Sequence, residues 1–425
     1  GVRVVTLPRM LPSSYAKQAL SHVGKPTPVV TKGLATMPRN IYDEDHESFR
    51  ASVKEFVERT LVPRAEEMIR DKTIPREIWK AAGDMGLFGL DIPEEFGGAG
   101  ILQDYRFRAI VLEETIQSGN GSLAGAFGIQ DDLAVPYIVH MGTQEQKEKW
   151  LPGMADGSKK VVFAITEPDA GSNSHRITTT ARKDGGDWII KGQKTFISGI
   201  DQAQAVLVVG RTEDHKTGNL KPALFVVPTD TPGVKIVRNV GLYGEADNHG
   251  SHALIHYDNV RVPAEALLGG EGQAFVIAQT RLGGGRIHHA MRTIGLAQKA
   301  LDMMCERALS RETQGSRLSD KQFVQGYIAD SYAQLLQFRL MVLYTAWEID
   351  KYNDYKKVRK DIAAVKVAMP TVLHDIAWRA MQVHGALGVT NEVPFLGMVT
   401  GAAVMGLADG PTEVHKTTVA KQVLR

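Results

Sequence analysis

The spacing of apolar residues divides the chain into helical and β segments. Over residues 43–160 apolar residues recur every three or four positions, which predicts an N-terminal helical domain. The same spacing returns over residues 271–425 and includes two long stretches, Ile294–Ala308 and Tyr332–Trp347. Long helices joined by short loops predict that this last part is a helical bundle.

Between these two parts the apolar period changes to two. Short alternating runs, separated by clusters of Gly, Asp, Asn and Pro, predict an all-β domain over residues 161–270. The order of domains is therefore helical, β and helical, which places the chain in the α+β class. The expected strands are Val161–Ile165, Arg176–Arg182, Trp188–Lys191, Ala205–Arg211, Ala223–Val227 and His252–Tyr257.

Composition excludes several classes of protein. The 425 residues contain 50 Lys+Arg and 48 Asp+Glu, and a net charge of +2 gives no reason to expect a nucleic-acid partner. A single cysteine, Cys305, excludes an intrachain disulfide and a cysteine-rich metal site. The longest apolar stretch near a helix, Leu340–Trp347, is far shorter than the roughly 20 residues that span a bilayer, so no membrane span is expected.

The first 42 residues differ from the rest of the chain. They contain six basic residues, seven Ser or Thr and no acidic residue. This composition fits an organellar transit peptide and a flexible basic leader or linker equally well. The expected location is the mitochondrial matrix in the first case, and the cytoplasm if the protein is bacterial.

Motif absences narrow the possible functions. The sequence has no G-x-G-x-x-G after a strand, no G-x-x-x-x-G-K-[ST], no G-x-S-x-G and no H-E-x-x-H. The sequence therefore lacks the main motifs that would identify a Rossmann dinucleotide-binding protein, a phosphate-loop protein, a serine hydrolase or a zinc protease.

Six motifs occur in order along the β and C-terminal parts. They are Ile165–Ser172 (ITEPDAGS), Gly192–Gly199 (GQKTFISG), Asp258–Pro263 (DNVRVP), Gly269–Gly272 (GGEG), Arg311–Gly315 (RETQG) and Gln382–Gly388 (QVHGALG). This series resembles the acyl-CoA dehydrogenase family, and the resemblance extends from about Tyr42 to Arg425. The segment Arg286–His289 and the Asp-Gly-Pro at 409–411 resemble a divergent branch of that family.

The resemblance implies both a fold and an activity. The fold is an N-terminal helical domain, a middle antiparallel β-barrel and a C-terminal four-helix bundle. The activity is FAD-dependent α,β-dehydrogenation of an acyl-CoA thioester to the 2-enoyl-CoA, as in fatty acid β-oxidation, with electrons passed to an electron-transferring flavoprotein. The family implies a homodimer or homotetramer, and the sequence does not choose between them.

A flavin ring needs hydroxyl or backbone donors at its polar edge and a flat wall behind it. The resemblance implies that Thr166 and Ser198 supply hydroxyl groups and that Phe196 supplies the wall. It also implies that Arg311 and Gln322 reach the flavin of a neighbouring subunit, where Arg can bind pyrophosphate through two parallel hydrogen bonds. The other residues implied to bind FAD are Phe163, Ile165, Gly171, Ser172, Ile197, Thr313, Gln382, Gly385, Pro411 and Glu413.

The candidate catalytic base is Asp409. In most of the family a glutamate followed by Gly and Thr removes the α-proton, and Asp409-Gly410-Pro411 stands at that place here. A second branch carries its base immediately before the bundle arginine, and that position is Gly285. Aspartate is shorter by one methylene, about 1.5 Å. We expect a dry pocket that raises the pKa of the base toward working pH.

Arg286 follows three glycines, Gly283 to Gly285, within an otherwise helical stretch. Glycine there costs about 1 kcal/mol relative to alanine, so a close backbone approach is expected. The resemblance implies that Arg286 faces the nucleotide or phosphates of coenzyme A. The other residues implied to bind the substrate are Ser172, Gly283 and Gly410. Adjacent residues His288 and His289 point to different helix faces, so no metal site is expected.

Two departures from the family leave other functions open. Pro411 and Glu413 replace a threonine and a glutamine, and Val399–Gly406 is small and apolar where charged residues are usual. One alternative is a flavin oxidase on the same scaffold that returns electrons to O₂ and acts on another substrate. The other is an inactive acyl-CoA-binding or lipid-binding scaffold.

Overall fold

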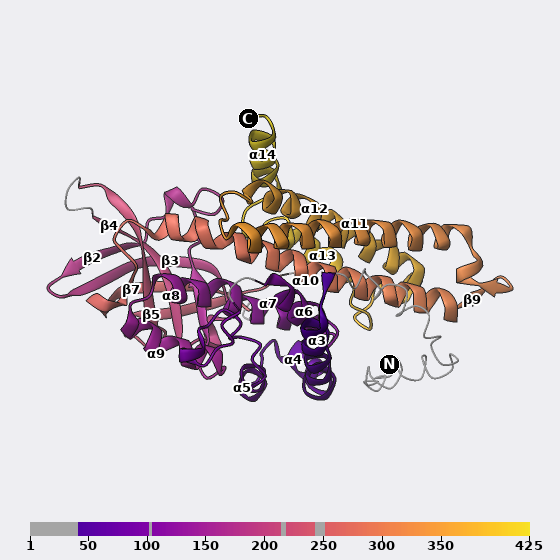
Figure 1. The fold of residues 1–425 in the computed structure, drawn as a ribbon, viewed down its shortest axis with the longest axis horizontal. Helices are drawn as coiled ribbons and strands as arrows, with labels where there is room; N and C mark the ends of the chain where they lie inside the picture. The colour runs from indigo at the N-terminus through magenta and orange to yellow at the C-terminus, as the bar shows by residue number, and fades with distance from the viewer. Residues whose placement is uncertain (1–40, 102–103, 214–217, 243–250) are drawn as a thin grey trace, which may run out of the picture.

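The computed structural model describes residues 41–101, 104–213, 218–242 and 251–425, with the backbone alone for 275–283. The predicted leader, residues 1–42, lies almost entirely outside the described residues. Figure 1 shows an elongated molecule with the sheet domain at one end and long helices that extend to the other end. The N-terminal helices of residues 44–128 lie against the middle of the molecule, on one side of the long helices, whereas those of residues 135–155 lie against the sheet domain.

The N-terminal part is helical, as predicted. Its main α-helices are α3 (Glu44–Phe56), α4 (Ala65–Asp71), α5 (Arg76–Asp84), α6 (Tyr105–Ile116), α7 (Gly121–Gly128), α8 (Val135–Met141) and α9 (Gln144–Ala155). A π-helical segment, η5 (Ile129–Ala134), joins α7 to α8 without a break. This wider turn places several polar side chains against the bundle, where they contribute to the site.

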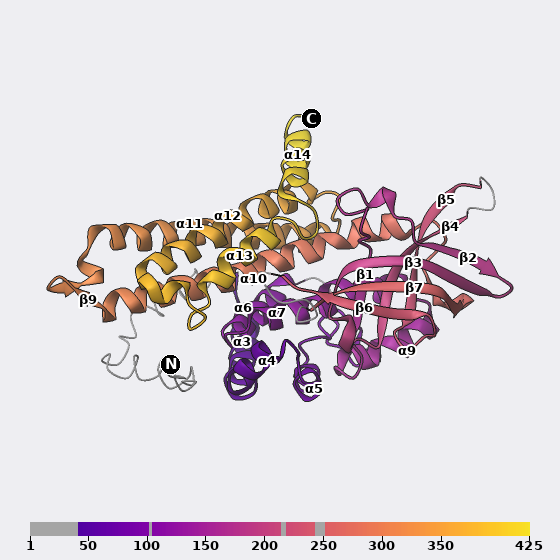
Figure 2. The same cartoon turned by 180° about the vertical axis from the view of Figure 1, so that it is seen from behind.

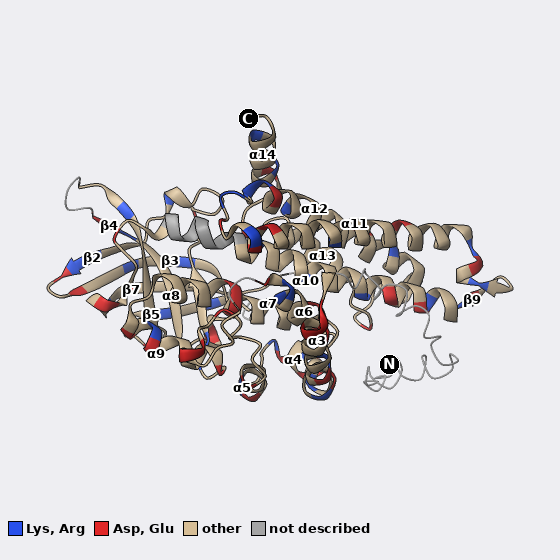
Figure 3. Ribbon diagram, viewed as in Figure 1, with Lys and Arg blue, Asp and Glu red and all other residues tan. Residues whose placement is uncertain are grey.

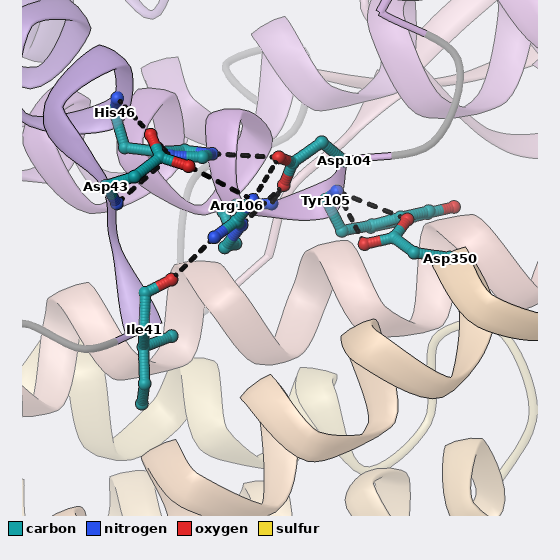
Figure 4. Close-up of polar contacts among 7 residues, drawn as sticks. All are labelled: Ile41, Asp43, His46, Asp104, Tyr105, Arg106 and Asp350. Carbon is teal, nitrogen blue, oxygen red and sulfur yellow. Dashed lines mark hydrogen bonds and ion pairs between the residues drawn. The ribbon is translucent and has the colours of Figure 1, made fainter.

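Polar contacts fasten the N-terminal domain to the bundle at the beginning of α6 (Figure 4). The ring of His46 lies between two carboxylates, with Nδ1 2.5 Å from Asp43 and Nε2 2.9 Å from Asp104. The backbone N–H of Tyr105 donates to Asp350 at 3.1 Å. Because Asp350 lies on a bundle helix, this bond satisfies a free N–H of the first turn of α6 and also joins the two domains.

The middle domain is an eight-stranded sheet. Its strands are β1 (Val161–Ala164), β2 (Thr180–Asp184), β3 (Asp187–Ser198), β4 (Ala205–Glu213), β5 (Leu220–Pro228), β6 (Val234–Val240), β7 (His252–Pro263) and β8 (Leu267–Leu268). The order is β6-β7-β3-β2-β4-β5-β8, and β1 pairs with β4. Most pairings are antiparallel, but β1 and β2 each run parallel to β4.

Several strands differ from the sequence prediction, which also lacks the short strand β8. Arg176 ends a short 3₁₀ turn, and β2 begins only at Thr180. Strands β3 and β7 are each longer than predicted, because they pair through β-bulges that the alternation pattern does not reveal. The prediction missed β6 because its apolar residues do not alternate: Ile236 and Val237 are consecutive and both exposed.

The C-terminal part contains the predicted long helices. They are α10 (Ala274–Ser310), α11 (Gln322–Tyr352), α12 (Arg359–His384) and α13 (Phe395–Met405), and the last helix is α14 (Thr412–Val423). The first four form the bundle, whereas α14 projects away from the body in both views (Figure 2). The predicted class, a helical domain, a central sheet domain and a helical bundle, is therefore confirmed.

The largest core joins the bundle to the N-terminal domain. It includes Leu112 of α6, Ile287 of α10, Phe338 of α11 and Leu373 of α12, all buried. Charged residues of both signs are interspersed along the described helices and strands (Figure 3). Among the described helices none is long and apolar enough to cross a membrane.

Candidate active site

A buried ion pair holds the two β-domain motifs together. Lys194 of β3 is 0% exposed, and its Nζ donates to Glu167 at 2.8 Å and to the carbonyl of Ile165 at 2.9 Å. Glu167 also accepts hydrogen bonds from Thr178 and from the backbone N–H of Thr179. Burial alone would raise the pKa of Glu167, but the bonds from Lys194 and these threonines outweigh it and lower the pKa to about 2.

This ion pair positions the residues that were predicted to face flavin. The backbone N–H of Thr195 donates to the carbonyl of Thr166 at 2.9 Å, so the two motifs lie side by side. Thr166 and Ser198 are half-buried, and Ile197, the residue of β3 before Ser198, is buried. The structure therefore brings Thr166, which follows β1, beside the C-terminal end of β3, where Phe196 and Ser198 lie.

Phe196 has an unusual backbone and an exposed ring. Its φ is +60°, and it lies in a bulge of β3 between Lys194 and Ile197. A bulky residue in the left-handed region is a rare and strained conformation that occurs mostly at functional sites. The ring is 53% exposed, so this strain presents a flat aromatic face outside the core.

Four further residues predicted to bind FAD lie on β1 or in the segment that follows it. The ring of Phe163 on β1 stacks on that of Tyr137 of α8, with centroids 5.3 Å apart and an angle of 5°. Ile165 is half-buried, whereas Gly171 and Ser172 are exposed in the turn that follows. These positions leave the backbone and hydroxyl groups of the turn accessible to a ligand.

The loop between α13 and α14 holds Asp409 in a fixed turn. Its φ is +55°, and that of Gly410 is +103°. Its carbonyl accepts a hydrogen bond from Arg286 Nε at 3.1 Å and lies 3.2 Å from His415 Nε2. The carbonyl of Ala408 accepts one from Lys366 Nζ at 2.6 Å. Three residues from α10, α12 and α14 therefore fix the backbone on either side of the carboxylate.

The carboxylate of Asp409 contacts His289, with Oδ2 3.1 Å from Nε2. Burial would raise the pKa of Asp409, but the bond from His289 and the charges of Lys366 and Arg286 hold it well below its usual range. The expectation of a raised pKa is therefore wrong for this structure. The reason is that the pocket contains cations and a hydrogen-bond donor in addition to apolar side chains. Asp409 is ionised at neutral pH, the form that a base requires.

The glycines before Arg286 permit close contacts. An ideal Cβ on Gly285 would lie 3.3 Å from Asp409 Oδ2, and one on Gly284 would lie 3.2 Å from Tyr105 Oη. Gly283 lies in α10, within the segment for which only the backbone is described. Pro411 is half-buried at the N-terminus of α14 and Glu413 is exposed in its first turn, so both lie close in sequence to the carboxylate.

The remaining residues predicted to bind FAD lie at the other end of the bundle. Arg311 follows the last residue of α10, 25 residues after Arg286, and this length of helix spans about 38 Å. Figure 1 shows β9 (Glu312–Thr313), which follows Arg311, at the end of the bundle away from the sheet domain that carries Phe196, so one flavin site of a single chain cannot contain both residues. The residues of this second group are Arg311, Thr313, Gln322, Gln382 and Gly385, all exposed.

The sequence analysis missed a buried charged cluster beside α10. Arg108 of α6 pairs with Asp91 and Asp132, and its Nε lies 3.3 Å from Asp131. His288 Nδ1 lies 2.7 Å from Asp132. Burial raises the pKa of Asp131 to about 8, although Arg108 opposes this effect. Spacing could not reveal this cluster, since its members come from four separate segments.

The two adjacent histidines thus face different carboxylates. His288 pairs with Asp132, and His289 pairs with Asp409. Within the described residues no group of three or more His, Cys, Asp or Glu side chains could hold a metal ion.

The observed groups fit a flavin. The exposed aromatic ring of Phe196, the half-buried hydroxyl side chains of Thr166 and Ser198 and the exposed turn at Gly171 and Ser172 suit a planar ring with a polar edge. The strained φ of Phe196 supports this fit independently of the motif, because the exposed ring has no role in the core. Thr166, Phe196 and Ser198 would hold the ring, and the fold and site together define a flavin-binding oxidoreductase.

Comparisons with known proteins support the assignment to the flavin-binding oxidoreductases. Models of the acyl-CoA dehydrogenase N-terminal, middle and C-terminal domains match residues 43–158, 162–260 and 272–424. Acyl-CoA dehydrogenase FadE12 of Mycobacterium tuberculosis is 39% identical over 348 residues, which cover 82% of this chain and 88% of that protein. A glutaryl-CoA dehydrogenase of Mycobacterium smegmatis in complex with FADH2 has a TM-score of 0.80 and 27% identity, over 91% of this chain and 96% of that one.

A longer relative matches as well. Acyl-CoA dehydrogenase family member 11 of Rattus norvegicus is 38% identical over 348 residues, which cover 80% of this chain but 44% of the relative. The chain thus spans less than half of the length of that relative. The chain belongs to the acyl-CoA dehydrogenase family of FAD-dependent oxidoreductases.

Proposed function

We propose that the protein dehydrogenates an acyl-CoA thioester at its α,β bond and that Asp409 is the base. The observation that carries this proposal is the ionised carboxylate of Asp409, fixed beside Gly285 by contacts from three helices. A carboxylate in this state can accept the α-proton without first losing one of its own. FAD held by Thr166, Phe196 and Ser198 would supply the acceptor for the β-hydride, while Asp409 takes the α-proton and the electrons of the α C–H bond form the C=C bond.

Other residues of the chain bind and orient the substrate in this proposal. Arg286 donates from Nε to the carbonyl of Asp409 at 3.1 Å, so its side chain lies beside the proposed base. Its guanidinium can still attract the phosphates of coenzyme A through its remaining N–H groups. The accessible turn at Ser172, the backbone at Gly283 and the backbone at Gly410 complete the predicted contacts with the acyl-CoA.

We also propose that the protein works as a homo-oligomer, a dimer or a tetramer. Support comes from the length of α10, which separates Arg286 from Arg311 by about 38 Å. A second copy could bring its Arg311, Gln322 and Gln382 to the site of the first. An electron-transferring flavoprotein is the proposed electron acceptor, as the family resemblance implies.

Anaerobic mixing with a panel of acyl-CoA esters tests the proposed reaction. The visible flavin band should bleach with one class of ester, which would also identify the acyl group. Flavin that is never reduced by any ester, or hydrogen peroxide formed in air without an added acceptor, would favour the oxidase. Protein that contains no flavin would favour the inactive scaffold.

The Asp409→Asn variant tests the assignment of the base. It should retain flavin and bind acyl-CoA but lose at least 10²-fold in kcat, the lower end of what general-base catalysis contributes. Asp258→Asn is the matched control, because Asp258 is an exposed carboxylate on β7 that pairs with Lys235 at 2.8 Å. Unchanged turnover of the Asp409→Asn variant would remove Asp409 from the role.

A further inference from the structure

His289 lies between a cation and the proposed base. Its Nε2 is 3.1 Å from Asp409 Oδ2, and its Nδ1 is 3.2 Å from Nη2 of Arg292, one helical turn further along α10. The nitrogen atoms of an arginine can only donate hydrogen bonds. Arg292 therefore donates to Nδ1, which must carry a lone pair, and the ring proton lies on Nε2. The imidazole is neutral and donates Nε2–H to the carboxylate.

The surroundings fix this arrangement from several elements. Arg292 also donates to the sulfur of Met405 at 3.3 Å. An ideal Cβ on Gly125 of α7 would lie 2.0 Å from Nη1 of Arg292, so only glycine leaves room for the guanidinium. The neighbouring glycine of the same helix, Gly128, leaves room for His288 in the same way.

The charged groups around His289 act in opposite directions. Asp409 and Asp132 favour an imidazolium, whereas burial and the positive charges of Arg292 and Lys366 oppose it. Burial has the largest effect, and the pKa of His289 falls to about 4. The ring is thus neutral over the whole range in which an enzyme is normally assayed.

We propose that Arg292 and His289 are positioning residues for Asp409: Arg292 keeps the imidazole neutral with its proton on Nε2, and His289 directs the carboxylate toward the substrate. This inference rests on the proposed function, with Asp409 as the base. An imidazolium in the same place would bind the carboxylate more tightly, because both partners would then be charged. A carboxylate bound in this way would be a weaker base. By keeping His289 neutral, Arg292 therefore preserves the base strength of Asp409 through the imidazole.

The pH dependence of the Arg292→Met variant tests the first part. Without the guanidinium, Nδ1 can accept a proton, and the pKa of His289 should rise above about 4, because the positive charge of Arg292 is one of the effects that lower it. Normalised to its own value at pH 8, kcat/KM of this variant should fall about tenfold by pH 5, the effect of one pKa unit in base strength. The wild type should show no such step, and the double variant Arg292→Met/His289→Gln should lose it again.

Lys299→Met is the matched control, since Lys299 lies on α10 two turns beyond Arg292 and its removal also deletes one positive charge. A profile of Arg292→Met that superimposes on the wild type down to pH 5 would overturn the role of Arg292. The same step in Lys299→Met would also overturn it, because the effect would then be one of general charge.

Substitutions of His289 test the second part and remain informative if Arg292→Met does not fold. His289→Gln keeps a donor near the position of Nε2, whereas His289→Leu removes it. The leucine variant should lose about tenfold in kcat with KM changed less than twofold, and the isotope effect of α-deuterated substrate should rise. The glutamine variant should recover most of the loss. Equal losses in both variants, or an unchanged isotope effect, would refute positioning.

The two proposals can fail separately. If Asp409→Asn is fully active, the base assignment fails whatever the His289 variants do. If Asp409→Asn is inactive while the variants of His289 and Arg292 behave as the wild type, only the positioning role fails.

Discussion

Removal of the Lys194 ammonium group should destabilise strand β3, which carries the flavin-facing residues Phe196 and Ser198. The Lys194→Met variant loses bonds of 2.8 Å to Glu167 and 2.9 Å to Ile165, and it leaves a carboxylate that is only 4% exposed. Removal of one partner from a buried ion pair typically costs 3–5 kcal/mol. Glu167 keeps its hydrogen bonds from Thr178 and Thr179, so we expect the lower end, about 3 kcal/mol.

Hydrogen–deuterium exchange of β3 measures this change locally, without assuming that the whole chain unfolds in one step. Because 1.4 kcal/mol is a factor of ten, 3 kcal/mol should accelerate amide exchange over residues 187–198 by roughly 10²-fold. Lys191→Met is the control, since Lys191 lies on the same strand and is exposed. The double variant Lys194→Met/Glu167→Gln should exchange more slowly than Lys194→Met, because it removes the unpaired buried charge.

Two results would refute this reasoning. Exchange of β3 in Lys194→Met within threefold of the Lys191→Met control would show that the ion pair does not hold the strand. A double variant that exchanges faster than Lys194→Met would show that the carboxylate is stabilised without its cation. Retention of flavin, measured by absorbance after gel filtration, should decrease in parallel with the loss of protection at Phe196.

Three other predictions follow from the described contacts. Arg311→Ala should weaken flavin retention and the oligomer, and a variant fully loaded with flavin, measured by absorbance and light scattering, would contradict a shared site. The pKa of Glu167 in the folded protein is about 2, below its ordinary value of 4.5. The hydrogen bonds of Glu167 therefore stabilise the fold above about pH 4.5, and this stabilisation is lost as the pH falls toward 2. In acid unfolding, the Glu167→Gln variant should lack about 3 kcal/mol of the pH-dependent stability of the wild type. Gly128→Ala should lower the melting temperature, because its Cβ would meet His288 at 1.6 Å. Gly326→Ala, whose Cβ meets nothing within 4 Å in α11, should raise it, and the reverse order would refute the packing argument.

Much of the fold could be predicted because each domain repeats one simple pattern. The helical period over Ile294–Ala308 predicted a helix that the structure extends to residues 274–310. The alternating runs predicted six of the eight strands of the sheet, although β3 proved longer. Strand β6 was missed because Ile236 and Val237 are consecutive exposed residues, so period two is absent there. The periodicity of apolar residues therefore predicts helices and strands well where one face of the element is buried.

Only those residues of the site that belong to a sequence motif could be predicted. Thr166 and Phe196 were identified from their motifs, and the structure places Thr166 beside the C-terminal end of β3, which carries Phe196. Lys194 and Glu167 belong to the same two motifs, but their pairing depends on how β3 folds against the preceding turn. His289 and Asp409 are 120 positions apart, and no sequence period links an α10 side chain to a loop after α13. Contacts of this kind depend on tertiary packing alone.

The left-handed turn at Asp409 has a consequence for the choice of base. At φ +55° asparagine and aspartate are tolerated better than longer side chains, because their short polar groups can bond locally. Gly410 follows at φ +103°, where a Cβ would lie 2.9 Å from His415. Glutamate at this position would restore the usual length of the base but would conflict with the turn that aims it. The identity of the base and the geometry of the turn are therefore coupled, and a variant with another base at this position needs a different loop conformation.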